Sequence, residues 1–160
     1  MNELDRGMDR ALRQAQFAFD VDEVPVGAVV MRGERILGVG HNHIVTGCDP
    51  TAHAEMIVIR EACQKLGRWR LTGATLYVTI EPCPMCAGAL VMSRIDRLVY
   101  GSADYKAGAV ESLFNVTQNS ALNHSMMVTS GVKTDECSGI MKEFFRERRK
   151  QKKILTIIDK

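Results

Sequence analysis

One histidine and a closely spaced pair of cysteines constrain the fold of this chain more than any other feature. The histidine stands in His53-Ala54-Glu55, and the cysteines stand in Pro82-Cys83-Pro84-Met85-Cys86. Imidazole nitrogen and thiolate sulfur are ligands that zinc prefers, and three protein ligands leave the fourth tetrahedral position open for water or substrate. The chain must therefore fold so that the two segments meet. The pattern predicts a catalytic zinc site rather than a closed structural one.

The two cysteines are placed to bind one ion together. Cys83 and Cys86 are three positions apart, so on a helical turn they share a face. Pro84 between them suits the first turn of a helix, where thiol pKa values fall and the metal-binding thiolate is favoured. Alone, the pair fits a redox site or half of a structural zinc site equally well, and His53 favours the metal site. A fourth ligand would close that site, and three further cysteines are candidates: Cys48, Cys63 and Cys137.

Glu55 is the candidate general acid and base. Residues two apart on a regular helix point to nearly opposite sides, so His53 and Glu55 reach one site only where a helix is beginning. The upstream segment Asp49-Pro50-Thr51 is typical of a helix start. Taken singly, His53 would be interpreted as a core histidine and Glu55 as a surface carboxylate. Their spacing from the cysteines favours a joint role, in which an unligated Glu55 moves protons for a zinc-activated water.

The hydrophobic pattern predicts helices that alternate with strands. An N-terminal amphipathic helix carries one apolar stripe: Leu4, Met8, Leu12, Ala15 and Phe19. Strands are expected at 24–31 and 35–42 around a turn, and at 74–80, 97–101 and 126–129. Helices are expected at 52–65, at 84–93 and from 134 into the C-terminal basic stretch. This order predicts a three-layer α/β/α fold with a central mixed β-sheet. We expect one domain at 1–153 and an apolar tail of unassigned role at 154–160.

Positive charge is concentrated near the C-terminal end. Residues 142–153 include seven basic and two acidic side chains, although the whole chain has a net charge of only +2. This distribution suggests a surface that binds a polyanion, but on charge alone a solvated helix that keeps the protein soluble is the more common explanation. Five cysteines without a disulfide framework are typical of a reducing compartment. With no apolar run of membrane-spanning length and no secretory leader, we expect a cytoplasmic protein without a membrane partner.

Several segments together resemble the bacterial tRNA-specific adenosine deaminases of the cytidine deaminase-like superfamily. Residues 23–29, 49–55 and 76–89 resemble segments shared across that superfamily, whereas 104–109 and 144–149 favour the tRNA enzymes. The His-x-Glu and Pro-Cys-x-x-Cys pattern is itself the described signature of zinc nucleobase deaminases. The resemblance covers nearly the whole chain. It implies a cytidine deaminase-like fold and hydrolytic conversion of adenosine to inosine at the wobble position of an arginine tRNA anticodon.

The resemblance also implies roles for individual residues. His53, Cys83 and Cys86 correspond to the ligands of one Zn²⁺ per subunit, and Glu55 corresponds to the proton shuttle. The positions that correspond to substrate contacts are Val26, Asn42 and Ala54 around the flipped base, Asp104 and Lys106 beside its flanking nucleotides, and Phe145, Arg146, Arg148 and Arg149 in the terminal helix. The implied partners are a tRNA anticodon stem-loop and a second copy in a homodimer. The basic helix is then interpreted as an RNA-binding surface.

Three alternative functions stay open. The nearest is a free-base or nucleoside deaminase, such as a guanine or cytosine deaminase, which needs no basic terminal helix. Pro84 stands where the tRNA enzymes commonly carry an aliphatic residue, and proline also occurs there in the similar guanine deaminases. A non-catalytic deaminase-like subunit would only bind RNA, and the presence of Glu55 argues against it. A purely structural zinc module would require a fourth protein ligand.

Overall fold

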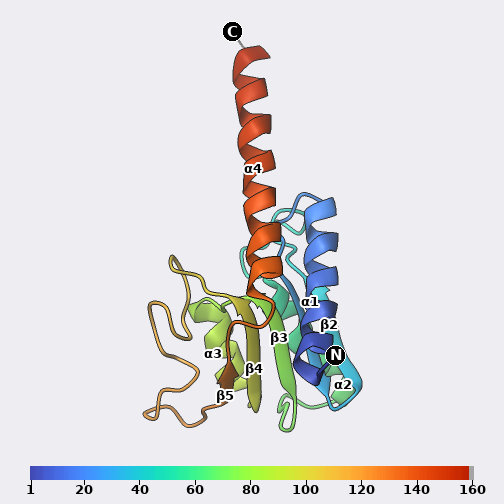
Figure 1. Cartoon of the computed structure of the whole chain (residues 1–160). Helices are drawn as coiled ribbons and strands as arrows, with labels where there is room; N and C mark the ends of the chain where they lie inside the picture. The colour runs from blue at the N-terminus through green and yellow to red at the C-terminus, as the bar shows by residue number, and fades with distance from the viewer. Residues whose placement is uncertain (159–160) are drawn as a thin grey trace.

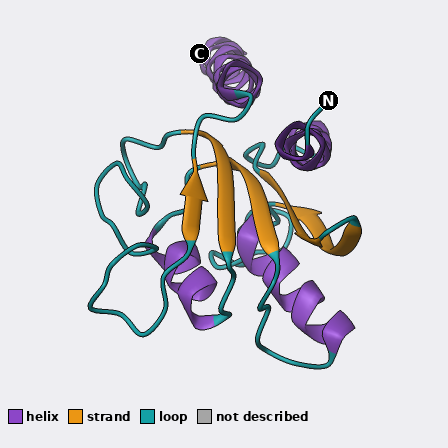
Figure 2. Cartoon of the chain, turned by 60° about the horizontal axis from the view of Figure 1, so that its bottom comes forward, coloured by secondary structure: helices purple, strands orange, loops and turns teal. Residues whose placement is uncertain are grey.

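The protein, described by a computed structural model over residues 1–158, has one five-stranded sheet between two pairs of helices. Helices α1 and α4 lie on one face of the sheet, and α2 and α3 lie on the other (Figures 1 and 2). The predicted three-layer α/β/α architecture is therefore confirmed. In chain order the elements are α1 (Glu3–Asp20), β1 (Gly27–Arg32), β2 (Arg35–His41), α2 (Ala54–Leu66), β3 (Thr75–Ile80), α3 (Pro84–Met92), β4 (Arg97–Ser102), β5 (Met127–Thr129) and α4 (Thr134–Ile158).

The sheet is mixed, as predicted, with the strand order β2-β1-β3-β4-β5. Strand β1 runs antiparallel to β2 and to β3, whereas β4 runs parallel to β3 and to β5. Parallel neighbours require a crossover connection, and α3 supplies it between β3 and β4. Because α3 follows the C-terminal end of β3 directly, the cysteine segment lies at that end of the sheet.

Apolar side chains fill both spaces between the layers. The face covered by α2 and α3 buries, among others, Val30, Val58, Leu76, Leu90 and Leu98. The face covered by α1 and α4 buries Met8, Val29, Tyr77, Val99 and Cys137. Strands buried on both faces give near-continuous apolar runs, and this explains the composition of β1 and β3. The predicted stripe of α1 faces the sheet through Met8 and Ala15, which are fully buried, whereas Leu4, Leu12 and Phe19 are partly exposed.

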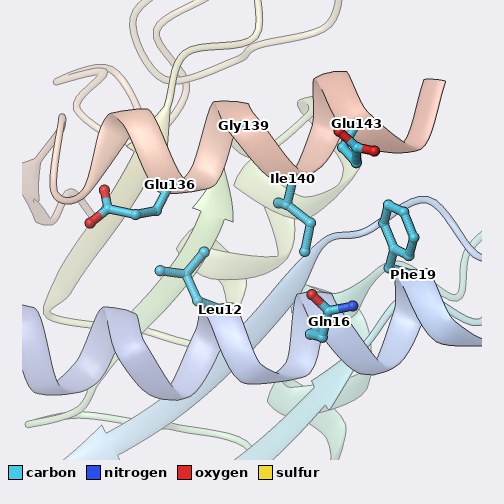
Figure 3. Close-up of a pocket in the computed structure, with 7 residues that line it drawn as sticks. All are labelled: Leu12, Gln16, Phe19, Glu136, Gly139, Ile140 and Glu143. Atoms are coloured by element: carbon cyan, nitrogen blue, oxygen red, sulfur yellow. The ribbon is translucent and has the colours of Figure 1, made fainter. Parts of the chain in front are cut away.

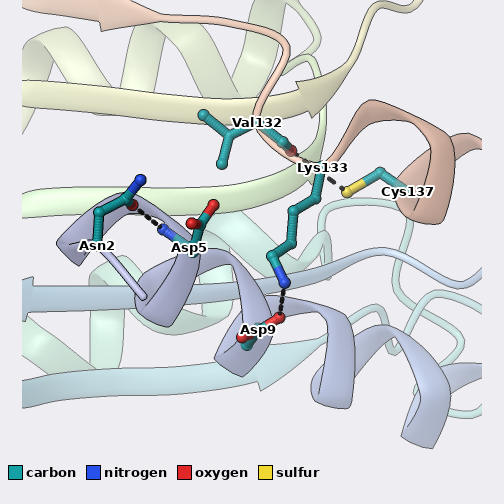
Figure 4. Close-up of polar contacts among 6 residues, drawn as sticks. All are labelled: Asn2, Asp5, Asp9, Val132, Lys133 and Cys137. Carbon is teal, nitrogen blue, oxygen red and sulfur yellow. Dashed lines mark hydrogen bonds and ion pairs between the residues drawn. The ribbon is translucent and has the colours of Figure 1, made fainter.

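Polar contacts hold both α1 and α4 near their N-terminal ends (Figure 4). The Asn2 side chain caps α1 by accepting a hydrogen bond from the Asp5 N–H at 2.8 Å. Lys133, which precedes α4, forms a half-buried salt bridge with Asp9 of α1. The thiol of Cys137 points to the carbonyl of Val132, 3.9 Å away. The Thr134 hydroxyl donates to the Gly101 carbonyl of β4 at 3.1 Å, so the start of α4 is fixed to both α1 and the sheet.

Helix α4 continues well beyond the body of the protein (Figure 1). Residues 154–158, predicted only as an apolar tail, form its last turns and are exposed to solvent. Residues 159 and 160 lie outside the described residues. Within the described part of the chain, no helix combines the length and the hydrophobicity needed to cross a membrane.

The first strand begins later than predicted. The apolar run from 24 predicts a strand there, but β1 begins at Gly27. Pro25 has no N–H to donate to a sheet, and the Val26 N–H bonds instead to the Val24 carbonyl at 2.8 Å in a tight turn. Residues 24–26 therefore lie at the end of the sheet, and Val24 and Val26 face a cavity there.

Candidate active site

The predicted histidine and cysteine ligands come together. The Nδ1 atom of His53 lies 3.6 Å from the sulfur of Cys83 and 3.6 Å from that of Cys86. Zinc bonds of about 2.3 Å to sulfur and 2.0–2.1 Å to nitrogen, at a tetrahedral angle, also place S and N about 3.6 Å apart. The donor set and its spacing therefore fit a zinc ion. Among the described residues this is the only such cluster, and the other three cysteines lie outside it.

Helix α2 begins one residue after His53, and this explains how His53 and Glu55 reach the same site. His53 is the N-cap with extended backbone (φ −70°, ψ 150°), whereas Glu55 is the second helical residue. The helix predicted at 52–65 is therefore present, but it begins two residues later, at Ala54. The segment 49–51, expected to start the helix, forms a turn before it instead. In this turn Asp49 Oδ1 accepts a hydrogen bond from the Thr51 N–H at 2.8 Å. The change of backbone direction at His53 brings both side chains to one side.

The cysteines occupy the start of α3 as predicted. Cys83 is the N-cap, Pro84 is the first helical residue and Cys86 lies in the first turn. Hydrogen bonding from Cys86, and then from His53, lowers the pKa of Cys83 to about 4. The hydrogen bond with Cys83, together with burial, raises the pKa of Cys86. The structure thus favours one thiolate that shares protons with its two neighbours, and metal ligation replaces such protons.

Glu55 is buried beside this cluster, with 4% of its surface exposed. Burial raises the pKa of its carboxyl to about 7, although its own backbone N–H and His53 act in the opposite direction. A carboxyl group with a pKa near neutrality both accepts and donates a proton there. The environment of Glu55 therefore suits a proton shuttle.

A cavity of about 210 Å³ opens over the cluster. Six of the residues singled out from the sequence line it: Val26, Asn42, His53, Glu55, Cys83 and Asp104. The segments that supply them are far apart in the sequence. They meet where β2 and β3 end and where α2 and α3 begin. Most of the lining is apolar, with a few convergent polar groups, as in small-molecule sites.

Asn42 has a fixed orientation at the edge of the cavity. Its buried side-chain oxygen Oδ1 accepts a hydrogen bond from the Ala54 N–H at 2.9 Å. This bond identifies the oxygen, since a backbone N–H requires an acceptor. The Nδ2 amine is therefore the part of the side chain that can donate to a ligand. The pairing also holds β2 against the start of α2, next to His53.

The terminal helix reaches the cavity near its N-terminal end, where Met141 contributes to the lining. Of the predicted RNA-contacting residues, Arg149 and Phe145 are exposed, and Arg146 pairs with Glu143 on the same helix. Arg148 instead donates a hydrogen bond to the Asp22 carbonyl of the body. Lys106 is exposed on its loop and does not line the cavity, unlike Asp104.

Sequence reasoning assigned no role to several lining residues, of which Glu81 is the most informative. It directly follows the apolar strand β3, precedes the cysteine segment and is 2% exposed. A charged residue at the end of a buried strand, two positions before a candidate metal ligand, is a signal that the sequence did contain. Ile44 and Met141 also line the cavity, but no sequence pattern distinguishes them from ordinary apolar residues.

A larger groove of about 610 Å³ lies between α1 and α4, on the other face of the sheet from α2 and α3 (Figure 3). Leu12 and Ile140 point into it from the two helices, with Phe19 at one end. Its lining includes two carboxylates, Glu136 and Glu143, but no histidine or cysteine. The groove therefore lacks the convergent chemistry of the smaller cavity, which remains the candidate active site.

Comparison with known proteins agrees with this site. Residues 2–149 match the family model for MafB19-like deaminases. The tRNA-specific adenosine deaminase of Bacillus subtilis (strain 168) is 50% identical over 91% of both chains. A solved structure from studies of A-to-I editing by tRNA:A34 deaminases has a TM-score of 0.81 and 45% identity, covering 84% of this chain and 98% of that one.

A guanine deaminase from Bacillus subtilis has the same fold with a lower similarity. Its solved structure has a TM-score of 0.62 and 30% identity, covering 94% of this chain and 95% of that one. The fold alone thus accommodates different nucleobases, whereas the identities distinguish the two groups of relatives. The chain belongs to the family of tRNA-specific adenosine deaminases.

Proposed function

We propose that this protein hydrolytically deaminates adenosine to inosine at the wobble position of a tRNA anticodon, with an arginine tRNA as substrate. The observation that carries the proposal is the buried Glu55 beside three converging zinc-type ligands in a small, largely apolar cavity. A structural zinc module needs neither an open ligand position nor a buried carboxylate. A protein that only binds RNA has no use for a proton shuttle.

The residues that would hold Zn²⁺, one per subunit, are His53, Cys83 and Cys86. Zinc bound there supplies a Lewis acid that activates a water molecule at neutral pH. Glu55 takes a proton as the new C–O bond forms at C6 of the adenine, and it returns that proton to the ring nitrogen beside this carbon. Glu55 then transfers the remaining proton to the exocyclic amine as the C–N bond breaks. Ammonia and inosine result, so atoms and charge balance.

Asn42 and the terminal helix are proposed to recognise different parts of the substrate. The Nδ2 amine of Asn42 donates to the flipped base, while Val26 and the Ala54 backbone border it. Asp104 and Lys106 contact the flanking nucleotides, and Phe145, Arg146 and Arg149 contact the anticodon stem-loop. Arg148 is proposed to contact the stem-loop as well, and its hydrogen bond to the Asp22 carbonyl also holds α4 in place. We also propose a homodimer that acts in the cytoplasm, where tRNA is processed.

Inosine formation tests this function directly. Purified protein is incubated with an arginine tRNA that carries a wobble adenosine, and the nucleosides are analysed by mass spectrometry. Free adenosine, guanine, cytosine and cytidine are assayed in parallel. The expected result is inosine at the wobble position with little turnover of the small molecules. Turnover of guanine with intact tRNA would instead identify a free-base deaminase on the same fold.

Charge reversal on α4 is expected to weaken RNA binding. Arg149→Glu should raise the Kd for an anticodon stem-loop roughly tenfold and lower the slope of log K against log salt by about one, since one phosphate contact is lost. Fluorescence anisotropy at several salt concentrations measures both quantities. Arg35→Glu is the matched control, because Arg35 is also exposed but begins β2 at the end of the sheet away from the cavity. Equal weakening by both variants would contradict a specific role for α4.

A further inference from the structure

One buried carboxylate holds a whole loop beside the candidate active site. Glu81 Oε1 accepts hydrogen bonds from the backbone N–H groups of Glu111 at 2.8 Å and Ser112 at 2.9 Å. Its Oε2 accepts one from the N–H of Asp104 at 3.1 Å. These donors stand at both ends of the loop at 103–112, which follows β4 and lines the cavity through Asp104 and Ala107. The Glu81 side chain therefore bridges the two ends of the loop.

The loop is fitted closely around this carboxylate. A Cβ atom on Gly108 would lie 1.6 Å from Glu81 Oε2 and 2.5 Å from the Asp104 carbonyl oxygen, so only glycine fits there. The Gly108 N–H donates to that Asp104 carbonyl at 2.8 Å, and the Ala109 N–H donates to the Pro82 carbonyl at 2.8 Å. The loop thus contacts Glu81 and also Pro82, the residue that immediately precedes the Cys83 ligand.

The loop requires a carboxylate in this position rather than an amide. Three N–H donors converge on two oxygens, and each oxygen of an ionised carboxylate accepts hydrogen bonds. Glutamine would place an NH₂ group against at least one N–H donor, and that donor would lose its partner inside the protein.

We propose that Glu81 is a positioning residue that fixes the loop at 103–112 against the cysteine segment and thereby sets where Asp104 and Lys106 meet the nucleotides flanking the target base. This inference rests on the proposed function for its effect on RNA. Because both oxygens of Glu81 are bound by the loop, its contribution is to substrate binding rather than to proton transfer. We expect Glu55 and the proposed zinc ligands to keep their arrangement when the loop is released.

Steady-state kinetics test this role. Glu81→Gln is expected to raise KM for the stem-loop by about tenfold, while kcat changes by less than about threefold and the metal content stays that of the wild type. Glu111→Gln is the matched control, since it also removes one negative charge, from the loop that Glu81 binds. Its amide oxygen can still accept the Tyr100 hydroxyl bond, so KM should stay within about twofold. Equal KM values for the two variants, or loss of metal from Glu81→Gln, would overturn the proposal.

Gly108→Ala supplies a second variant that displaces the loop without changing any charge. It is expected to raise KM to a similar extent. When combined with Glu81→Gln, it should add less than the two single effects predict, because both substitutions release the same contact. Full additivity of the two substitutions would show that they act independently, and this would contradict the proposed anchor.

Hydrogen exchange followed by NMR tests the anchor without any RNA. Glu81→Gln should raise exchange at the amides of Asp104, Glu111 and Ser112 and leave the β3 and β4 amides unchanged. Unchanged exchange in the loop, or a rise throughout the protein, would refute a positioning role. This readout also separates the two proposals. If the wild type fails to produce inosine, the proposed function fails while the anchor is still tested.

Discussion

Replacement of Glu55 by glutamine is expected to lower kcat for inosine formation by roughly 10²–10⁴-fold, the range that general acid and base groups contribute. We expect the upper end of this range, because Glu55 is proposed to move two protons in each turnover. Glutamine keeps the volume of the buried side chain and its acceptor oxygen, but it cannot take up or release a proton under these conditions. Single-turnover kinetics with saturating enzyme measure the chemical step directly.

Metal content and a matched variant distinguish the loss of proton transfer from a loss of metal or a general effect on α2. Glu55→Gln should retain the metal content of the wild type, since Glu55 is not a proposed ligand. Glu61→Gln serves as the control on the same helix, because Glu61 is exposed and its oxygen accepts the Val39 N–H, a bond that glutamine can keep. That variant should retain wild-type kcat. A Glu55→Gln enzyme with more than a tenth of wild-type kcat would exclude Glu55 as the shuttle.

Replacement of Cys86 by serine is expected to abolish stoichiometric zinc binding, and activity with it. A serine hydroxyl does not ionise near neutral pH as a thiol does in such a site. The loss of affinity should exceed about 100-fold, because changes in groups that merely support metal ligands already cost 10–100-fold. Metal analysis after dialysis measures the stoichiometry. Because metal binding is coupled to folding, the Tm of the variant should also stop responding to added zinc.

Cys48→Ser is the matched control for the ligand variant. Cys48 is exposed, lies outside the cluster and donates only to the carbonyl of Val45. Its replacement should leave zinc content, activity and Tm as in the wild type. If Cys86→Ser bound zinc as tightly as Cys48→Ser, the three-ligand site would be wrong. The control also separates metal loss from a general effect of removing a thiol.

The layered fold could be predicted because its evidence is local. Each helix and strand carries its own hydrophobic period, and the alternation of elements restricts the sheet to a small number of arrangements. The cluster of His53 with Cys83 and Cys86 could be predicted because the histidine and the cysteine pair have a diagnostic spacing. The start of α2 could not, because the Asp49 side chain bonds locally in a turn that resembles a helix cap in sequence.

Other parts of the site depend on contacts that the sequence does not encode locally. The partners of Glu81 lie 23, 30 and 31 positions away, and no period or motif connects them. Arg148 belongs to a run of basic residues, yet it bonds to the carbonyl of Asp22, 126 positions away. The charge pattern predicts a segment that could bind RNA. It does not predict which basic residues of that segment form hydrogen bonds with the rest of the protein.

The attachment of α4 at Arg148 leaves a free arm of defined length. Ten residues follow Arg148 to Ile158, and at 1.5 Å per residue they extend about 15 Å beyond that attachment. Phe144 reinforces the attachment, because its ring packs edge-on against Phe19 of α1 with the two ring centroids 5.6 Å apart. Under the proposed function, this arm would meet parts of the anticodon stem-loop that lie beyond the flipped base. The attachment at Arg148 would then set how far along the RNA the protein can reach.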